Sequence, residues 1–229
     1  MTKIHDHKTI SVAIDGPSGA GKSTIARVLA KELNFVYVDT GALYRTIGYY
    51  ALRSGADPTM KSEVEPLLGE LKVELRYMDG VQHVYLNGED VSDHIRTPEV
   101  SLAASAVSAI PEIRRFLFQM QRDMAAAYNV IMDGRDIGTV VLPNADLKVF
   151  LTASVEDRAN RRYEELLSRK QTVKYEDVLN DMRKRDYDDT HRAIAPLKPA
   201  ADAVVVDTTG NTLEESVTIL KNMVKGLVQ

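Results

Sequence analysis

Short apolar runs alternate with segments of helical periodicity along most of this chain. The apolar, β-rich runs predict five strands, at residues 10–15, 35–39, 130–133, 147–151 and 203–207. Apolar positions at helical spacing predict helices at residues 22–34, 42–53, 98–110, 112–128, 154–170 and 212–227. Strands that alternate with helices are typical of a parallel sheet. We therefore expect an α/β fold in which a five-stranded parallel sheet is flanked by helices.

Helix-breaking residues mark two boundaries in this pattern. Thr40-Gly41 should separate the second strand from the helix at 42–53, and Pro111 should force Ile110 out of the α region. The helix after Pro111 presents a core face formed by Ile113, Phe116, Leu117, Met120 and Met124. The closing helix presents an apolar face formed by Leu213, Val217, Leu220, Val224 and Leu227.

Residues 70–92 follow a different pattern. Residues 71–77 and 81–86 alternate between apolar and polar positions, with Asp79-Gly80 between them and Asn87-Gly88 after them. These dipeptides are strong hairpin signals when they separate alternating runs. We expect a small antiparallel unit, inserted outside the parallel sheet, that forms an accessory lobe over the ligand.

The segment after the fourth strand is rich in charge. Ser154-x-x-Asp157 resembles a capping box and should open the helix at 154–170, on which Arg158, Arg161, Arg162 and Arg169 should form one cationic stripe. Glu164 and Glu165 could neutralise part of that stripe, and a solvated charged face is the alternative. Residues 175–192 carry both signs of charge and few apolar anchors, so we expect them to be mobile and to lie on the surface.

Gly16 to Ser23 match G-x-x-x-x-G-K-[ST], the phosphate-binding loop, between a buried-type strand and a helical pattern. Glycines allow backbone N–H groups to approach phosphate oxygens. Lys22 can place its ammonium between the β- and γ-phosphates, and the Ser23 hydroxyl can be a ligand of Mg²⁺. We expect a nucleoside triphosphate to contact Gly16, Pro17, Ser18, Gly19, Ala20, Gly21, Lys22, Ser23 and Thr24.

Three carboxylates, those of Asp15, Asp39 and Asp133, end strands beside this loop. Any of them could contact metal-bound water. Each could equally cap a helix or form hydrogen bonds within a loop, so none is assigned as a metal ligand.

Composition narrows the function classes further. The chain has 229 residues and no cysteine. Its net charge of −4 gives no global electrostatic reason to expect a nucleic-acid partner. No apolar run is long enough to span a membrane, and the polar N-terminus, with His5 and His7, lacks the apolar core of a signal peptide. We therefore expect a cytoplasmic protein without a membrane partner. No surface is marked as an oligomer face, so a monomer is the default.

Many cations should meet at the carboxyl ends of the strands: Lys22, Arg45, Arg114, Arg135, Arg158 to Arg162 and Arg185 to Arg192. A switch that holds a single nucleotide does not need so many. Transfer of a phosphoryl group to a second phosphate does, because it brings several negative charges together. The arginines after the fourth strand suit a lid that closes over the triphosphate and excludes water.

The sequence resembles the bacterial cytidylate kinases, within the nucleoside monophosphate kinases, over about residues 9–227. The resemblance is carried by five motifs: Ile14-Asp-Gly-Pro-Ser-Gly-Ala-Gly-Lys-Ser, Asp39-Thr-Gly-Ala-Leu-Tyr-Arg, Ile95-Arg-Thr-Pro-Glu-Val, Asp133-Gly-Arg-Asp-Ile-Gly-Thr-Val-Val and Arg192-Ala-Ile-Ala-Pro-Leu. It implies a P-loop kinase with a core at about 9–60, 100–153 and 193–229, a monophosphate-binding insert at about 61–99 and a helical lid at about 154–192. The hairpin insert looks like the enlarged lobe that distinguishes this family from adenylate kinases.

The resemblance also implies roles for individual residues. It implies that the acceptor phosphate is held by Arg45, Arg135 and Arg192. The base would be read by Ser105, Arg114 and Asp136, with Tyr44 near the ring and Asp39 on the same rim. The ribose would be held by Arg185 and Asp189. Lys22, Arg135, Arg162 and Arg192 would be the catalytic cations, and Arg158 and Arg161 would contact ATP.

These assignments predict a Mg²⁺-dependent enzyme that transfers the γ-phosphoryl group of ATP to CMP and to dCMP. Cytosine offers an amine donor to Asp136, whereas uracil would place a carbonyl there and leave the carboxylate unpaired. Two alternatives stay open. One is a kinase for UMP or another monophosphate, and the other is a nucleotide-gated P-loop switch or binding module.

Overall fold

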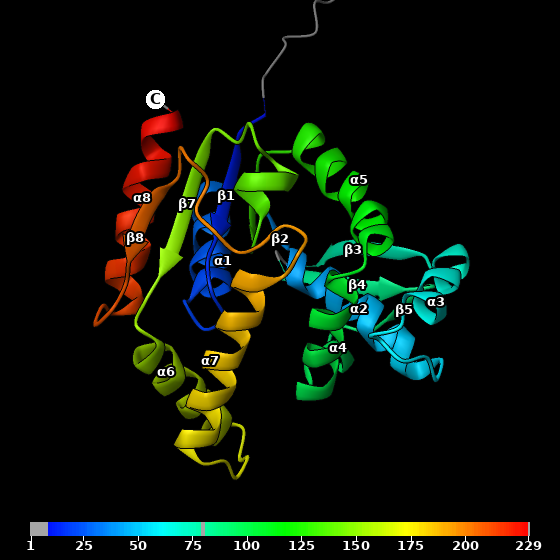
Figure 1. Ribbon diagram of the computed structural model, residues 1–229. Helices are drawn as coiled ribbons and strands as arrows, with labels where there is room; N and C mark the ends of the chain where they lie inside the picture. Colours follow the sequence, from blue (N-terminus) through cyan, green and yellow to red (C-terminus); the bar gives the residue numbers. More distant parts are fainter. Residues whose placement is uncertain (1–8, 79–80, 229) are drawn as a thin grey trace, which may run out of the picture.

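The central sheet of the computed structural model, which describes residues 9–78 and 81–228, has five parallel strands. Its order is β2-β6-β1-β7-β8, so β1, which leads into the phosphate loop, is central (Figure 1). The strands are β1 (Ser11–Asp15), β2 (Val36–Asp39), β6 (Val130–Gly134), β7 (Leu147–Thr152) and β8 (Val204–Asp207). All four pairings are parallel, and Asp15 lies beside Gly134 in the register of β1 and β6. The predicted fold class is confirmed.

Helices cover both faces of this sheet. On one face, α1 (Lys22–Leu33) and α8 (Leu213–Val228) pack on Val12 and Ile14 of β1, while Ala13 faces the side covered by α5 (Pro111–Ala127). In α8, Leu220 and Val224 are buried as predicted. The prediction is wrong for Leu213 and Leu227, which are exposed because they lie at the ends of the helix. No helix among the described residues is long and apolar enough to cross a membrane.

Strand β2 ends before Thr40-Gly41 as expected, and helix α2 (Thr40–Arg53) begins directly after it, two residues earlier than predicted. The cause is Asp39, whose Oδ1 accepts a hydrogen bond from the Ala42 N–H at 2.8 Å. A strand that ends in a capping residue needs no intervening turn. Asp39 therefore joins the strand end to the first turn of α2.

The insert forms its own layer. It contains α3 (Lys61–Val64), η1 (Glu65–Glu70), β3 (Val73–Met78), β4 (Val81–Leu86), β5 (Glu89–Asp90) and η2 (His94–Arg96), and α4 (Pro98–Ser108) begins at its end. Strands β3, β4 and β5 form a separate antiparallel sheet, as predicted. Asn87 and Gly88 have φ of 49° and 88°, which fits the expected turn. The turn predicted at Asp79-Gly80 lies outside the described residues.

The hairpin of the insert contacts the outer edge of β2. The Tyr77 hydroxyl donates to the Tyr37 carbonyl at 2.9 Å, and the Asp39 N–H donates to Gln82 Oε1 at 2.9 Å. Side chains thus satisfy backbone groups of an edge strand that has no further strand beside it. These two contacts connect the small sheet to the strand that positions α2.

Pro111 divides the helical region as predicted, and Ile110 is extended with φ −86° and ψ 118°. After it, α5 buries Ile113 and Leu117, and Phe116 and Met120 pack against the same core. The predicted core face is confirmed.

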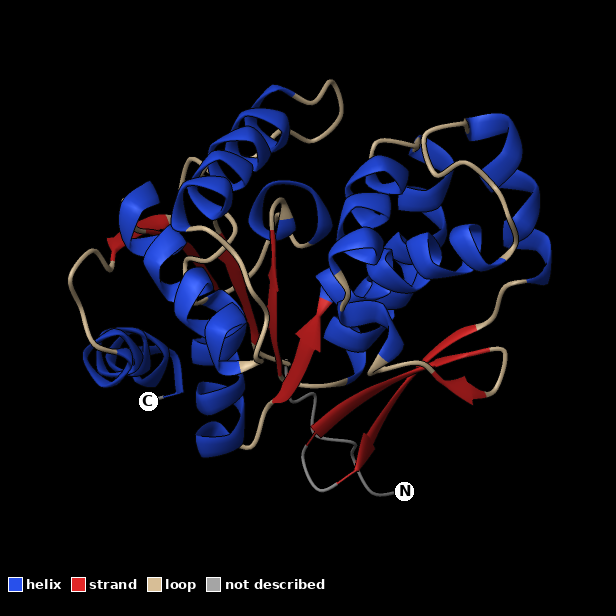
Figure 2. Cartoon of the chain, turned by 90° about the horizontal axis from the view of Figure 1, so that it is seen from below, coloured by secondary structure: helices blue, strands red, loops and turns tan. Residues whose placement is uncertain are grey.

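Two helices follow β7 at the carboxyl ends of the strands: α6 (Val155–Ser168) and α7 (Tyr175–His191). Ser154 caps α6 by accepting from the Asp157 N–H. Residues 175–191 form the regular helix α7, which lies on the surface as expected and buries Val178 and Met182. Seen from below in Figure 2, the helices form two groups on either side of the parallel strands, with the small sheet next to the helices of the insert.

Candidate active site

The phosphate loop runs from the end of β1 to the start of α1. Gly19 and Gly21 have φ of 75° and 87°, a region that favours glycine, and Gly21 occupies the cap position of α1. Lys22 begins the helix and is buried, and its Nζ donates to the Pro17 carbonyl at 2.6 Å. The lysine therefore folds back over its own loop.

Gly16 is the most sterically restricted residue of this loop. A Cβ at Gly16 would lie 1.9 Å from the Leu151 carbonyl oxygen, and the φ of Gly16 is 150°. We expect Gly16→Ala to lower the free energy of unfolding by about 2 kcal/mol or more, because the backbone of β7 must move. Urea unfolding measures this change. As a control, Gly226→Ala in α8, where a Cβ would meet open space, should leave the free energy of unfolding unchanged or raise it. A Gly16→Ala variant as stable as the wild type would contradict the close approach of Gly16 to Leu151.

The charge on Lys22 is poorly solvated here. Burial, reinforced by the positive charge of Arg135, lowers the pKa of Lys22 to about 7, although Asp133, Asp189 and Asp15 act in the opposite direction. An anion beside the ammonium would remove this penalty. The loop therefore favours a bound polyanion electrostatically.

The three carboxylates at the strand ends have different partners. Asp133 accepts from Ser23 Oγ at 2.7 Å and from the Tyr37 hydroxyl at 2.8 Å. Burial and the nearby charge of Asp39 raise the pKa of Asp133. Asp15 accepts hydrogen bonds from the backbone N–H groups of the segment after Asp136. Asp39 caps α2. Asp133 is thus the carboxylate that lies next to the predicted metal ligand.

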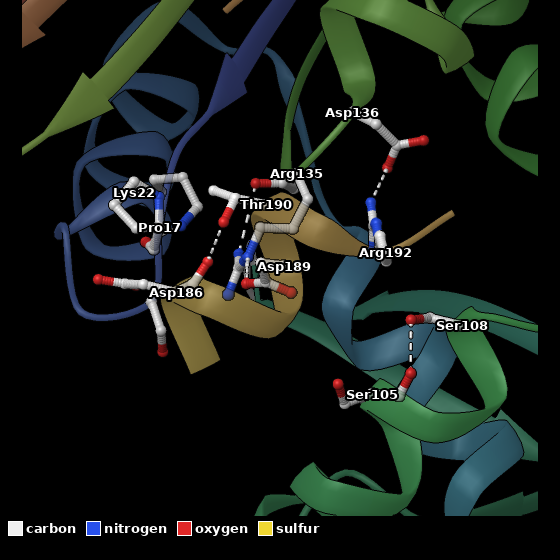
Figure 3. A network of polar contacts seen from close by, with 12 residues as sticks. Pro17, Lys22, Ser105, Ser108, Arg135, Asp136, Asp186, Asp189, Thr190 and Arg192 are labelled. Carbon is white, nitrogen blue, oxygen red and sulfur yellow. Dashed lines mark hydrogen bonds and ion pairs between the residues drawn. The ribbon is translucent and has the colours of Figure 1, made fainter. Parts of the chain in front are cut away.

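A second group of charges surrounds Asp136, which follows β6. Its carboxylate pairs with Arg114 of α5. It also pairs, at 3.4 Å, with Nη2 of Arg192 (Figure 3). Arg114 and Asp136 are both buried, and the Arg114 guanidinium lies 5.8 Å from the centre of the Tyr44 ring. Burial raises the pKa of Tyr44 to about 12. The ion pair of Arg114 and Asp136 thus lies beside the aromatic ring of Tyr44.

Ser105 lies on α4 near this group, with its hydroxyl exposed. Its carbonyl accepts from Ser108 Oγ at 2.8 Å, and the Ser108 carbonyl accepts from Arg114 Nη1 at 3.4 Å. The connection from Ser105 to Arg114 runs through Ser108 in this structure.

A third group connects β6 with α7. Arg135 Nε donates to Asp189 Oδ2 at 2.7 Å, and in Figure 3 this pair lies between Lys22 and Arg192. Burial, then the positive charge of Arg135, lowers the pKa of the neighbouring Arg185. Arg45 pairs with Asp39 at 2.8 Å, while its Nε is buried without a hydrogen-bond partner. Several guanidinium groups thus converge with fewer carboxylates to balance them.

The expected single stripe on α6 is divided into two parts. Arg158 is only 4% exposed, and its guanidinium binds both oxygens of Asp186 at 2.9 and 2.6 Å and the Ser18 carbonyl at 3.0 Å. Arg161 binds the Thr208 carbonyl, whereas Arg162 and Arg169 both pair with Glu165. Arg158 therefore connects the phosphate loop to α7, and the others lie toward solvent.

The structure brings most of the predicted site residues to one edge of the sheet. Thr24, in the first turn of α1, is exposed. Tyr37, Asp186 and Gln82 also make contacts at this edge, but they were not among the predicted site residues. Only Asp186 carried a detectable signal, since it precedes Asp189 by three residues and so lies on the same side of a helix.

Comparisons with known proteins identify the family of this chain. A model of the cytidylate kinase family matches residues 12–226. The cytidylate kinase of Caldicellulosiruptor bescii is 48% identical over 208 residues, which cover 91% of this chain and 92% of the relative. That of Caldanaerobacter subterraneus subsp. tengcongensis is 50% identical over 209 residues, which cover 91% of this chain and 92% of the relative.

One solved structure shares the fold at low sequence identity. An uncharacterized protein from Eubacterium ventriosum ATCC 27560 aligns with a TM-score of 0.54 and 14% identity over 96% of this chain and 99% of that one. The family match covers most of the chain and includes the phosphate loop, Asp136 and the arginines around it. The chain belongs to the cytidylate kinase family.

Proposed function

We propose that this protein transfers the γ-phosphoryl group of ATP to CMP, giving ADP and CDP, and that dCMP is a second acceptor. The observation that carries the proposal is the buried pair of Asp136 and Arg114, with the partly buried Arg192 beside it, at the same sheet edge as the phosphate loop. Membership of the cytidylate kinase family supports the same reaction.

On the ATP side, Lys22 and the backbone N–H groups of residues 16–24 would hold the triphosphate. Ser23 Oγ and Asp133 form an oxygen pair that suits Mg²⁺, an ion that is commonly held by one or two protein oxygens together with phosphates and water. Because Ser23 donates its proton to Asp133, a lone pair on Oγ is free for a cation. When bound, Mg²⁺ would neutralise phosphate charge.

On the acceptor side, Arg45, Arg135 and Arg192 would hold the phosphate of CMP. The buried, unpartnered Nε of Arg45 supports this role, since a phosphate oxygen would satisfy it. Asp189 and Arg185 would contact the ribose, and Arg162 would approach the transferred group. An oxygen of the acceptor phosphate is itself the nucleophile, so no covalent intermediate with the protein is needed.

Base selection would come from opposed hydrogen-bonding patterns. Cytosine presents an amine donor beside N3 and O2 acceptors, which matches a carboxylate next to a guanidinium. Asp136 and Arg114 supply that pair, with Tyr44 beside the ring and Ser105 at its rim. Uracil would turn an acceptor toward Asp136 and leave a buried carboxylate unpaired.

The test is ADP release from ATP and Mg²⁺, measured with CMP, dCMP, UMP, AMP and GMP in turn and without an acceptor. Turnover that depends on CMP or dCMP is expected. Preference for another monophosphate would retain the kinase and remove the assigned base site. Hydrolysis without an acceptor, or no turnover, would favour a nucleotide-gated module.

ATP binding should be accompanied by proton uptake at alkaline pH. The pKa of Lys22 is about 7 in the free protein, so much of it is neutral at pH 8. Triphosphate charge would raise that pKa, so the bound state holds more protons than the free state. Affinity for ATP should then fall as pH rises above 7.

Calorimetry at pH 8 in buffers of different ionisation enthalpy, with ATP and EDTA, measures this uptake. Lys22→Met should abolish most of it. Equal uptake by the variant would assign the proton to another group.

We further propose a cytoplasmic monomer, consistent with the absence of cysteine and of a marked oligomer surface in the sequence. The division into a core, an insert at about 61–99 and a lid at about 154–192 belongs to the same proposal. It is supported by the separate antiparallel sheet and by the separate α6–α7 cluster.

A further inference from the structure

Asp15 ends the central strand immediately before the phosphate loop, yet both of its oxygens contact another segment. Oδ1 accepts from the Ile137 N–H at 2.8 Å, and Oδ2 accepts from the Gly138 N–H at 2.7 Å. Asp15 is 4% exposed. Burial raises the pKa of Asp15 to about 6, against the effect of the two N–H bonds. It is therefore mostly ionised at neutral pH.

These two N–H groups open η3 (Ile137–Val141), a single turn of π-helix. Asp136 occupies the cap position of this turn but makes no capping hydrogen bond, and its φ of −148° and ψ of 27° are irregular. A residue at such a position commonly caps the turn with its own side chain. Asp15 takes that role here and leaves the Asp136 carboxylate to Arg114 and Arg192.

Gly138 supports the close approach. A Cβ at this position would lie 3.2 Å from Cγ and Cδ of Lys148 and 3.4 Å from Asp15 Oδ2. A larger residue would push the turn away from the carboxylate. The lack of a side chain at Gly138 therefore allows its N–H to approach the Asp15 carboxylate closely.

We propose that Asp15 is a positioning residue that fixes the Asp136 carboxylate and thereby sets the preference for cytosine over uracil. The inference rests on the proposed function, because it assumes that Asp136 reads the base. The proposal gives Asp15 a role in the site for the acceptor nucleotide, although Asp15 directly precedes the phosphate loop.

The test is the ratio of kcat/KM for CMP to that for UMP. In Asp15→Asn, one backbone N–H would face an amide NH₂ instead of an oxygen, so the turn carrying Asp136 must shift. We expect the ratio to fall roughly tenfold or more, as for a buried donor that loses its acceptor. A variant that affects only folding or ATP binding would lower both values equally and leave the ratio unchanged, which would overturn the proposal.

A double-mutant cycle tests whether Asp15 acts through Asp136. In an Asp136→Ala background, Asp15→Asn should change the ratio by less than about twofold, because coupled sites are not additive. A full effect in that background would also overturn the proposal. Should Asp15→Asn fail to fold, Asp15→Ser, which leaves room for water at the two N–H groups, is measured in the same way against the same criteria.

Asp146→Asn is the matched control, since Asp146 Oδ2 accepts from the Ser11 N–H at 2.9 Å at the other end of β1. It should leave the ratio unchanged. Turnover by the wild-type protein distinguishes failure of the proposed function from failure of this inference. Without turnover of CMP the proposed function fails, whereas turnover of CMP with an unchanged ratio in Asp15→Asn defeats this inference alone.

Discussion

Replacing Lys22 by alanine should lower kcat with ATP and CMP by at least about a hundredfold, as expected for the loss of one preorganised charge at a transition state. The lysine is buried, touches the Pro17 carbonyl and lies where the phosphate loop opens into α1. Its ammonium is the cation nearest the loop backbone, and no other side chain in the loop carries charge.

The loss should come with an intact fold. Lys22 carries a charge that burial disfavours, so its removal should not lower the free energy of unfolding, and the measurement is urea unfolding beside steady-state kinetics. Lys31→Ala, on the exposed last turn of the same helix, is the control and should keep full activity. A near-native rate for Lys22→Ala would refute the assigned phosphate-loop mechanism.

The second large effect is expected at Asp136. Asp136→Asn keeps the size of the side chain but can turn an amide donor toward the base, which suits the uracil carbonyl. The preference for CMP over UMP should fall by on the order of a hundredfold, as in sites that select a substrate by a buried polar pair. Initial rates over a range of each monophosphate give the ratio.

Asp136→Ala should also destabilise the protein. Arg114 and Arg192 would lose their shared carboxylate, and breaking a buried ion pair from one side costs about 3 kcal/mol. Asp123→Asn, on the exposed face of α5, should change neither stability nor preference. A preference that survives in Asp136→Asn would place base selection elsewhere.

The fold was largely predictable because its signals are local. The glycines of the phosphate loop, Pro111 and Asn87-Gly88 each act within a few residues, and the structure confirms all three. Helix α7 was not predicted as a helix because little of its packing comes from apolar periodicity. Arg158 binds Asp186 from a helix more than 20 residues earlier, a contact that no window along the sequence reveals.

The sequence predicted the residues proposed for the site, but not the contacts between them. Motifs identified Lys22, Arg135 and Asp136, whose chemistry fits phosphate and base. The bond from Tyr37 to Asp133 and the capping of η3 by Asp15 depend on which strands lie side by side, because β1 and β2 both flank β6. Strand order is a property of the packed sheet, and the pattern of each strand alone does not contain it.

The pairing of site arginines with carboxylates has a consequence for ligand binding. Arg135 is held by Asp189, Arg45 by Asp39 and Arg158 by Asp186. If a phosphate binds these guanidinium groups as proposed, it would compete with an anion already in place, so association would be in part an ion exchange rather than only the neutralisation of bare charge. Added salt should therefore weaken substrate binding less than the number of arginines suggests, since both sides of the exchange are screened.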